Sequence, residues 1–527
     1  MSKTSLETQV LIIGSGIAGC AAALTLARNG REVLLVTAGS SLDEGNTALA
    51  QGGISFKAPD DDPKIMEKDI LTAGWKHNYL QAVRFLCHKG PEVLQKILID
   101  DLEVPFTRIP GKGFHLTREG GHSLPRILHC ADYTGRAIMD ALLQAVRREQ
   151  NINLLLAHTA IDLLTTHHHC TRQDIRYHLN NRCVGAYVLE QSTGNVLKIL
   201  ADCTIVATGG MGQIFLNSTN SASSLGSGLA MAHRAGARLM NLEFIQFHPT
   251  ALHHRGPRKF LISEALRGEG ALLVNSRGEP FMHRYDPRKD LAPRDIVTRA
   301  IVEEMIRTRD DLVYLDAGTH IHDADKRFPT IYKKCLEHGI DMRSQLIPVV
   351  PAAHYFCGGI LVDTNGRTTI ERLYAAGECA CTGLHGANRL ASTSLLEGLL
   401  WGHTIAEHIS SKQGPKSPLS KRIKSSIPDW RFLGNKKNED PVLIAQDWAT
   451  IKHTMWNYVG INRTSARLHR GFEDMRNLNK RLHDFYKETA ISRSLVNLFH
   501  GCHTAYIITT AAMRNKKSIG CHFREDK

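Results

Sequence analysis

The sequence predicts an α/β protein in which a Rossmann-like dinucleotide-binding domain is interrupted by an inserted mixed α+β capping domain and followed by a C-terminal helical bundle. Two observations support the first part. A glycine-patterned turn joins a strand to a helix near residue 14, and strands of the same kind recur at 203–208 and 373–378. The bundle is supported by apolar residues that recur at helical spacing near the C-terminal end: Trp448, Ile451, Met455 and Val459.

The turn lies within a complete βαβ unit. Residues 10–13 and 31–36 predict strands, and the alanine-rich stretch 20–28 between them predicts a helix. Three glycines set the turn: the first permits it, the second lets the backbone approach a pyrophosphate, and the third allows close helix–strand packing: Gly14, Gly16 and Gly19. The helix start then directs unpaired N–H groups at the phosphates. Because Thr37-Ala38 replace the usual acidic residue after the second strand, part of the adenosine grip must come from elsewhere.

The remaining elements give the domain boundaries. A hairpin over 183–189 and 197–200 precedes the strand at 203–208, and helices are predicted over 293–307 and 328–338. The stretch 410–440 is rich in Lys, Ser and Pro, which is typical of a linker. The predicted domains are a discontinuous nucleotide-binding domain over 1–235 and 354–409, a capping domain over 236–353, a linker over 410–440 and a helical domain over 441–527.

Composition excludes several classes of protein. Apolar residues make up 42% and charged residues 22%, as in ordinary globular chains. The net charge of +13 suits acidic partners, namely nucleic acid, an anionic membrane or carboxylate substrates. The basic residues are scattered and aromatics are only 6%, which argues against a nucleic-acid platform. The apolar stretch 9–27 lacks a preceding basic region and carries patterned glycines, so we expect a soluble cytoplasmic protein with no membrane partner.

Cysteine and histidine patterns predict no metal site. The twelve cysteines include no CxxC pair, which excludes zinc-ribbon and thioredoxin-type signatures. Cys379 and Cys381 form a lone CxC, for which simple packing is the better interpretation. The run 167–170 (His-His-His-Cys) could hold a metal, but it has no second ligand pair nearby, and we expect an exposed loop.

Longer strings identify a family. They occur in one order along the chain: Asn46–Gly53, Thr117–Ser123, Gln246–Thr250, Ala292–Asp295, Pro351–Tyr355 and Gly383–Arg389. On these motifs the chain resembles the fumarate reductase/succinate dehydrogenase flavoprotein superfamily, and within it the branch that oxidises L-aspartate. The resemblance runs from Val10 to the C-terminal end and is weakest over 410–440. It implies an FAD-binding domain whose cofactor residues are Gly14, Ser15, Gly16, Ile17, Ala18, Gly19, Asn46, Thr47, Ala48, Leu49, Ala50, Gln51, Gly52, Gly53, Glu378, Ser394 and Leu395.

The resemblance also implies a site for a four-carbon dicarboxylate, whose two negative ends need cationic partners. Arg389 is suited to a bidentate carboxylate grip, and His248 and His354 can donate to carboxylate oxygens. Ser263 replaces a family threonine and keeps its hydroxyl. Arg294 is the proton carrier by resemblance, although neutralising a guanidinium at pH 7 costs about 7 kcal/mol. The alternative is that Arg294 is a second carboxylate clamp.

Three positions distinguish this chain within the superfamily. Glu119, with Arg294 and His248 one of the predicted catalytic residues, can pair with the α-ammonium that aspartate has and succinate lacks. The alternative is a solvated loop residue. Asn46 stands where succinate dehydrogenases carry a histidine bonded to FAD, so we expect non-covalent FAD. Ser227 replaces a family aspartate, which predicts a weakened flavin contact.

The implied reaction is oxidation of L-aspartate to iminoaspartate by hydride transfer from Cα to the flavin, with O2 or fumarate as the electron acceptor. The product is unstable, so a quinolinate synthase is the implied metabolic partner, leading to NAD. The nearest alternative is a soluble fumarate reductase or succinate-oxidising flavoprotein, against which Glu119 argues. A second alternative, a non-catalytic nucleic-acid binder, is supported by the net charge alone.

Overall fold

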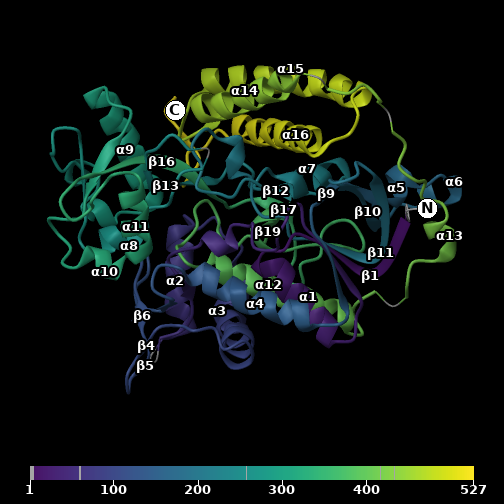
Figure 1. Ribbon diagram of the computed structural model, residues 1–527, viewed down its shortest axis with the longest axis horizontal. Coiled ribbons are helices and arrows are strands. Elements are labelled where there is room, and N and C mark those ends of the chain that lie inside the picture. Colours follow the sequence, from purple (N-terminus) through teal and green to yellow (C-terminus); the bar gives the residue numbers. More distant parts are fainter. Residues whose placement is uncertain are drawn as a thin grey trace.

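A seven-stranded sheet forms the centre of the molecule (Figure 1). The structure, a computed structural model, describes residues 5–58, 61–256, 258–415, 417–432, 434–438 and 440–526. The strand order is β8-β2-β1-β11-β10-β9, with β18 beside β11. The strands are β1 (Ser5–Ile13), β2 (Val33–Val36), β8 (Ile152–Leu155), β9 (His158–Thr165), β10 (Cys183–Glu190), β11 (Val196–Val206) and β18 (Leu373–Ala375).

Strand β11 joins the parallel and antiparallel parts of this sheet. Along one edge it runs parallel to β1, pairing Ile205 with Ile12. Along the other edge its first half pairs antiparallel with β10 and its last three residues pair parallel with β18. The prediction of two separate strands at 197–200 and 203–208 is therefore wrong. Asp202, between them, lies within β11 because β1 pairs with residues on both sides of it, and its side chain accepts a hydrogen bond from the Leu419 N–H (2.8 Å).

The glycine turn between β1 and α1 (Ile17–Arg28) is packed as closely as backbone atoms allow. Gly14 has φ +115°, and a Cβ there would lie 2.2 Å from the carbonyl oxygen of Ala207. A Cβ on Gly19 would lie 2.0 Å from the carbonyl oxygen of Gly14. Helix α1 can therefore approach the ends of β1 and β11 only because these two residues are glycines.

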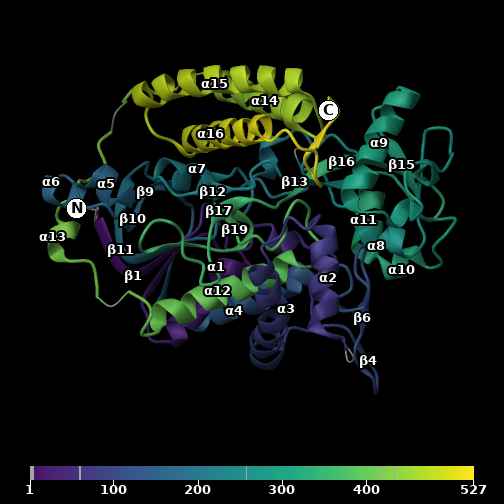
Figure 2. The same ribbon diagram turned by 180° about the vertical axis from the view of Figure 1, so that it is seen from behind.

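Helices cover both sides of the central sheet. On one side lie α1, α4 (Thr134–Arg148) and α12 (Ser394–Ser410). On the other lie α7 (Ser227–Arg234) and α16 (Arg493–Arg514), which the reverse view also shows (Figure 2). Trp401 of α12 is fully buried in the core shared by α1, α12 and the sheet, and its indole N–H donates to the Asp363 carbonyl (3.1 Å).

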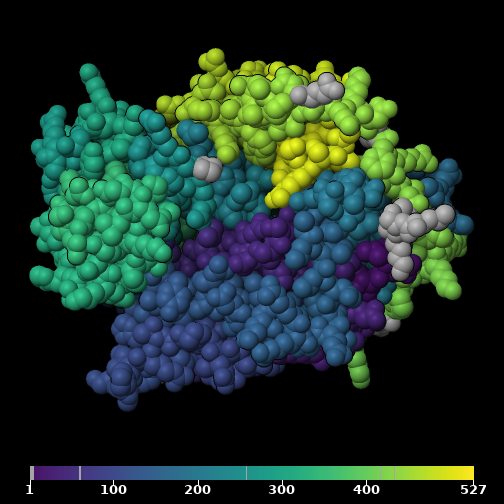
Figure 3. All heavy atoms as spheres, viewed as in Figure 1, coloured from purple at the N-terminus to yellow at the C-terminus, as the bar shows by residue number. Residues whose placement is uncertain are grey.

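The segment predicted to form the capping domain folds into a separate lobe. Its antiparallel sheet has the order β13-β16-β15-β14, comprising β13 (Ile245–Leu252), β14 (Leu272–Val274), β15 (Val313–Asp316) and β16 (Ile347–Phe356). Helices α8 (Glu264–Gly268), α9 (Arg294–Thr308) and α11 (Pro329–Glu337) pack on it, so the predicted helices at 293–307 and 328–338 are both present. The lobe has its own apolar core and stands out in teal and green at the left of the space-filling view (Figure 3).

The C-terminal part is helical, as predicted. Helices α14 (Pro441–Val459), α15 (Ser465–Glu488) and α16 lie side by side above the sheet in Figure 1. In the segment 410–440, predicted as a linker, the described residues between α12 and α14 form one short helix, α13 (Lys421–Lys424). It is nevertheless attached to the sheet, because Leu419 and Ile427 are buried in a cluster with residues of β9 and β10. The α/β fold class with its helical C-terminal region is confirmed.

The histidine run does not form the exposed loop that the sequence predicts. Residues Thr166–His169 form a one-turn helix, α5, after β9, and the Cys170 thiol is buried against the Ser426 hydroxyl. Within the described ranges no group of three or more His, Cys, Asp or Glu side chains is placed to hold a metal ion. All twelve cysteines are free and buried, including Cys379 and Cys381, for which packing was predicted.

The glycine turn yields a matched test of packing. In Gly19→Ala the new Cβ meets a backbone oxygen that cannot move aside, so the free energy of unfolding should fall by about 1–3 kcal/mol and FAD binding should weaken. Gly268→Ala in α8 meets nothing within 4 Å and should be neutral or slightly stabilising. Urea unfolding followed by circular dichroism measures both, and equal midpoints for the two variants would contradict the packing argument.

Candidate active site

A single cavity of about 510 Å³ contains both sets of residues that the motifs single out. It begins at the glycine turn, follows residues 46–53 and ends between the central sheet and the capping lobe. Every predicted cofactor residue lines it except Gly19, which packs beneath the turn. The predicted substrate and catalytic residues also line it: Glu119, His248, Ser263, Arg294, His354 and Arg389.

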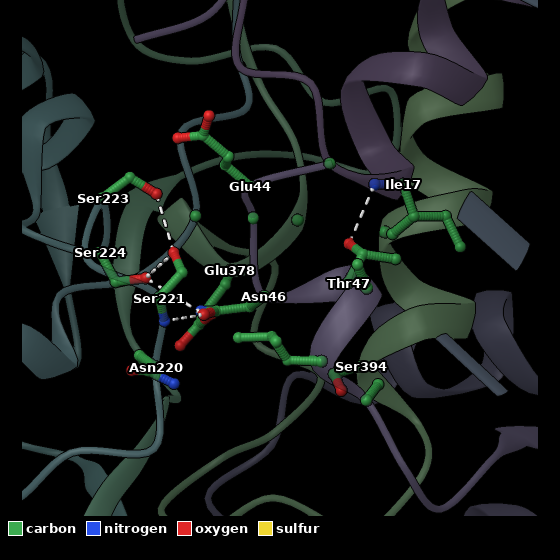
Figure 4. Close-up of a pocket in the computed structure, with 18 of the residues that line it drawn as sticks. Ile17, Glu44, Asn46, Thr47, Asn220, Ser221, Ser223, Ser224, Glu378 and Ser394 are labelled. Carbon is green, nitrogen blue, oxygen red and sulfur yellow. Dashed lines mark hydrogen bonds between the residues drawn. The ribbon is translucent and has the colours of Figure 1, made fainter. Parts of the chain in front are cut away.

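Asn46 connects three segments of the cofactor end (Figure 4). Its side-chain oxygen accepts hydrogen bonds from the Ser221 N–H (2.7 Å) and the Ser224 hydroxyl (3.3 Å), and its amide donates to Glu378 (3.2 Å). Glu378 also accepts from the Phe356 N–H (3.0 Å). Asn46 thereby fixes the loop 220–224 against the strand-end carboxyl group.

The same end places a carboxyl group in a poorly solvated position. Glu378 is half-buried by surface exposure, but its exposed part faces the cavity, and protein encloses it on the other sides. This desolvation raises the pKa of Glu378 to about 7, although hydrogen bonds from the Phe356 N–H and Asn46 favour the charged form. The carboxyl group can therefore gain or lose a proton near neutral pH.

Two guanidinium groups define the opposite end. The side-chain oxygen of Gln246 accepts from Arg294 (3.2 Å) and from Arg389 (3.3 Å), so one amide oxygen bridges both cations. Arg389 also donates to the Ser394 hydroxyl (2.7 Å) and lies 4.5 Å from the ring centre of Tyr355. Burial, and after it the charge of Arg294, lowers the pKa of Arg389.

Glu264 balances part of this positive charge. Its carboxylate accepts from Nε of Arg294 at 2.6 Å. Burial by itself would raise the pKa of Glu264, but the charges of Arg294 and Arg267 outweigh it, and the pKa lies below its ordinary value. Ser263, the preceding residue, caps α8 by accepting from the Ala265 N–H (3.3 Å) and is buried in the cavity wall.

His248 and His354 form a neutral pair beside the two arginines. Their ring centres are 5.1 Å apart. Burial lowers the pKa of both rings well below the ordinary value, and the charge of Arg294 lowers them further. Nδ1 of His248 lies beside both the N–H (3.2 Å) and the carbonyl oxygen (3.1 Å) of Thr250, and Nε2 has no partner among the described atoms. A buried ring nitrogen is thus left for a bound ligand.

Glu119 adds a carboxylate to the cavity that also contains this neutral histidine pair. It accepts from the Ser392 hydroxyl (2.6 Å), and a Cβ on Gly52 would lie 2.3 Å from its Oε1. Desolvation raises the pKa of Glu119, while Arg294 and Arg389 act in the other direction. The alternative of a solvated loop residue does not describe this position, which is enclosed and hydrogen-bonded.

Four site residues received no role from the sequence: Gln246, Glu264, Tyr355 and Ser392. Gln246 precedes His248 by two residues on β13, and alternation along a strand places such residues on one face. That spacing could have identified it. Glu264 adjoins Ser263 and Tyr355 adjoins His354, but nothing local shows that either side chain turns toward an arginine. Ser392 has no signal of its own.

Comparison with known proteins agrees with this geometry. A family model described as FAD binding domain matches residues 9–395, and one described as fumarate reductase flavoprotein C-term matches 448–527. The chain is 43% identical to an L-aspartate oxidase of Pseudomonas aeruginosa, over 99% of this chain and 95% of that one. It is 37% identical to a chloroplastic L-aspartate oxidase of Arabidopsis thaliana, over 100% and 82%. The chain belongs to the L-aspartate oxidase family.

Solved structures place this family within a larger superfamily. A quinol-fumarate reductase with menaquinol superimposes with a TM-score of 0.88 at 26% identity, covering 99% of this chain and 93% of that one. Mycobacterium smegmatis Sdh1 in complex with UQ1 superimposes with a TM-score of 0.79 at 26% identity, covering 99% of this chain and 89% of that one. The predicted membership in the fumarate reductase/succinate dehydrogenase flavoprotein superfamily is confirmed.

FAD is the cofactor, as predicted, and the cavity fits it. Gly14 and Gly16 leave the turn free of side chains where a pyrophosphate approaches, and the Ile17 N–H that opens α1 is held by the Thr47 hydroxyl (3.1 Å; Figure 4). Asn46 and Glu378 supply polar groups further along the same cavity. Among the described residues no helix is long and apolar enough to cross a membrane.

Glu378 should make the stability of the FAD-free protein depend on pH. Its pKa is about 7 when folded against an ordinary 4.5, so the folded state binds the proton more tightly. The contribution of Glu378 to the free energy of unfolding, on the order of 3 kcal/mol, is fully present below about pH 4.5 and is lost as pH rises through 7. Glu378→Gln should flatten this dependence in urea unfolding between pH 4.5 and 8. Glu407→Gln, on the exposed face of α12, should leave it unchanged, and parallel pH profiles for all three proteins would contradict the assignment.

Proposed function

We propose that this protein oxidises L-aspartate to iminoaspartate with FAD, as the first step toward quinolinate and NAD. The observation that carries the proposal is the joint presence in one cavity of the Arg294 and Arg389 guanidiniums and of the Glu119 carboxylate, besides the Glu264 carboxylate that pairs with Arg294. Two cations suit the two carboxylates of aspartate, and Glu119 suits its α-ammonium. The substrate of a fumarate reductase or succinate oxidase has no ammonium group to pair with Glu119. Desolvation of the unpaired Glu119 carboxylate would therefore weaken the binding of such a substrate.

The carboxylate ends of the substrate are assigned to groups with hydrogen-bond donors facing the cavity. Arg389 is rigidly held by Gln246, Ser394 and Tyr355, so little side-chain entropy is lost when it binds a carboxylate. Nε2 of His248, which has no partner among the described atoms, supplies a neutral polar group at the same end. His354 and Ser263 complete this set of substrate-binding residues.

Proton transfer is assigned to Glu119 and Arg294. The glycine turn and residues 46–53 would hold FAD, which when bound would supply the acceptor for a hydride from the substrate carbon, with O2 or fumarate as the final electron acceptor. The substrate ammonium must also lose a proton, and Glu119, with its raised pKa, is placed to accept it. Arg294 carries the proton when fumarate is the acceptor, and the Glu264 carboxylate 2.6 Å from its Nε gives it a group for proton exchange. His248, neutral and buried, orients the substrate beside them.

The cofactor is held without a covalent bond under this proposal. Asn46 offers an amide where the flavinylated relatives carry an imidazole, and both ends of that amide are occupied by hydrogen bonds to Ser221 and Glu378. A cytoplasmic location belongs to the same proposal, since twelve free thiols suit a reducing compartment. The product hydrolyses readily, so a quinolinate synthase is the proposed metabolic partner. No nucleic acid is included among the partners.

The direct test is anaerobic mixing of the FAD-bound protein with L-aspartate while the 450 nm flavin band is followed. Bleaching by L-aspartate but not by succinate is the expected result. Bleaching by succinate alone would replace the proposal with the fumarate reductase alternative.

The guanidinium pair should be indispensable for flavin reduction. Arg389→Leu removes a desolvated carboxylate partner and should lower kcat/KM for both aspartate oxidation and fumarate reduction by at least about a hundredfold. Arg294→Lys keeps the charge but loses the forked geometry and the contact with Gln246, and should also be strongly impaired. Arg307→Lys, on the exposed side of α9, is the control. Near-normal turnover by Arg294→Lys would remove Arg294 from both proposed roles.

Glu119 should separate the two substrates. In Glu119→Gln the shape and the Ser392 contact can persist while the charge is lost, so kcat/KM for aspartate should fall about ten- to a hundredfold. Fumarate reduction should be unchanged or improved. The exposed neighbour variant Arg118→Gln should affect neither activity. A parallel loss of both activities in Glu119→Gln would mean that Glu119 acts through the fold and not through the substrate ammonium.

A further inference from the structure

The cofactor cavity extends beyond the segment to which FAD binding is assigned. Past the glycine turn it continues to the ends of β2 and β9, where Thr37, Ala38 and His158 line it. Two further lining residues at this cavity, Arg493 and Asn497, come from α16. The FAD-binding match ends at residue 395, so both lie in the C-terminal helical part.

A hydrogen-bonded chain attaches the start of α16 to the end of β2. The side-chain amide of Gln191 donates to the Ala38 carbonyl (2.9 Å) and to the Thr159 hydroxyl (2.9 Å). Arg493 in turn donates to the side-chain oxygen of Gln191 (3.1 Å). The guanidinium is thereby positioned beside the strand end at which a Rossmann-type fold places the cofactor ribose.

This is also the place where the expected acidic residue is missing. Thr37 and Ala38 cannot accept hydrogen bonds from ribose hydroxyls as a carboxylate does. Glu44 lines the same cavity, and its carboxylate accepts from the Ser40 hydroxyl (2.6 Å) and the Ser41 N–H (3.0 Å). These contacts hold it in place, and in Figure 4 it lies apart from the Asn46–Glu378 cluster. The Ser40 hydrogen bond, with a smaller contribution from the charge of Arg493, keeps the pKa of Glu44 below its ordinary value.

We propose that Arg493 and Asn497 of α16, together with Glu44, form the adenosine half of the FAD site. Glu44 accepts from the ribose hydroxyls, and Arg493 and Asn497 supply donors and a planar cation toward the adenosine. The C-terminal helical part is then a cofactor-binding element as well as a packing layer. The inference rests on FAD occupying this cavity, and it makes adenosine recognition dependent on contacts between parts of the chain about 450 residues apart.

Two flavins separate this proposal from a merely structural role of α16. FMN has the isoalloxazine ring and one phosphate but lacks the adenosine. Full-length protein freed of FAD is titrated calorimetrically with FAD and with FMN. In the double variant Arg493→Ala/Asn497→Ala the Kd for FAD should rise about tenfold while the Kd for FMN stays at its wild-type value. Glu44→Gln should raise the Kd for FAD by about three- to tenfold, again without an effect on FMN.

The control is Arg514→Ala, at the opposite end of α16, which should bind both flavins as the wild type does. The melting temperature of the FAD-free double variant should fall only slightly below that of the FAD-free wild type, because Arg493 is exposed, Asn497 is half-buried and the main loss is the Gln191 contact. An unchanged Kd for FAD, or an equal weakening of FAD and FMN, would overturn the proposal. Wild-type protein that binds neither flavin would overturn it together with the assignment of FAD. No aspartate is present in these titrations, so failure of the substrate proposal would leave their outcome unchanged.

Discussion

Two like charges, the guanidiniums of Arg294 and Arg389, lie in one cavity largely removed from solvent, and the arrangement around them follows from that repulsion. Gln246 bridges them with one amide oxygen, Glu264 pairs with Arg294, and Tyr355 offers its ring face to Arg389. The nearby histidines remain neutral because burial lowers the pKa of both rings, and the charge of Arg294 lowers them further. Arg389 is held by the neutral groups of Gln246, Ser394 and Tyr355, so a carboxylate of the substrate can supply its counter-charge.

Holding these groups together requires three segments to meet. Gln246 comes from β13 of the capping lobe, Arg294 from the start of α9, and Arg389 from the loop before α12. Ser394 connects the substrate end of the cavity with the cofactor end. Its hydroxyl accepts a hydrogen bond from Arg389, and it is the first residue of α12, in which the next residue, Leu395, lines the cofactor end. The lobe must therefore dock on the central domain in one orientation for the substrate site to exist.

The prediction from sequence succeeded where the signal was local. The glycine turn, the flanking strands and the helices at 293–307 and 328–338 each depend on residues close together in the chain, so spacing and composition were sufficient. It failed at 197–208, where two strands were predicted, because β1 pairs with one continuous strand, β11, on both sides of Asp202. It also left 410–440 without a role in packing, since the burial of Leu419 and Ile427 depends on strands more than 200 residues away.

The sequence by itself determined the α/β class, the dinucleotide turn, the family and the set of chemically capable residues, because motifs of several residues survive as linear strings. Only the tertiary structure decided how those residues act. It paired Glu119 with the Ser392 hydroxyl, joined Asn46 to Glu378, left His248 Nε2 without a partner among the described atoms and brought α16 to the cofactor cavity. Protonation states and hydrogen-bond partners depend on solvent exclusion and on charges within a few ångströms. Both are set by chain segments that are distant in sequence, so no linear pattern contains them.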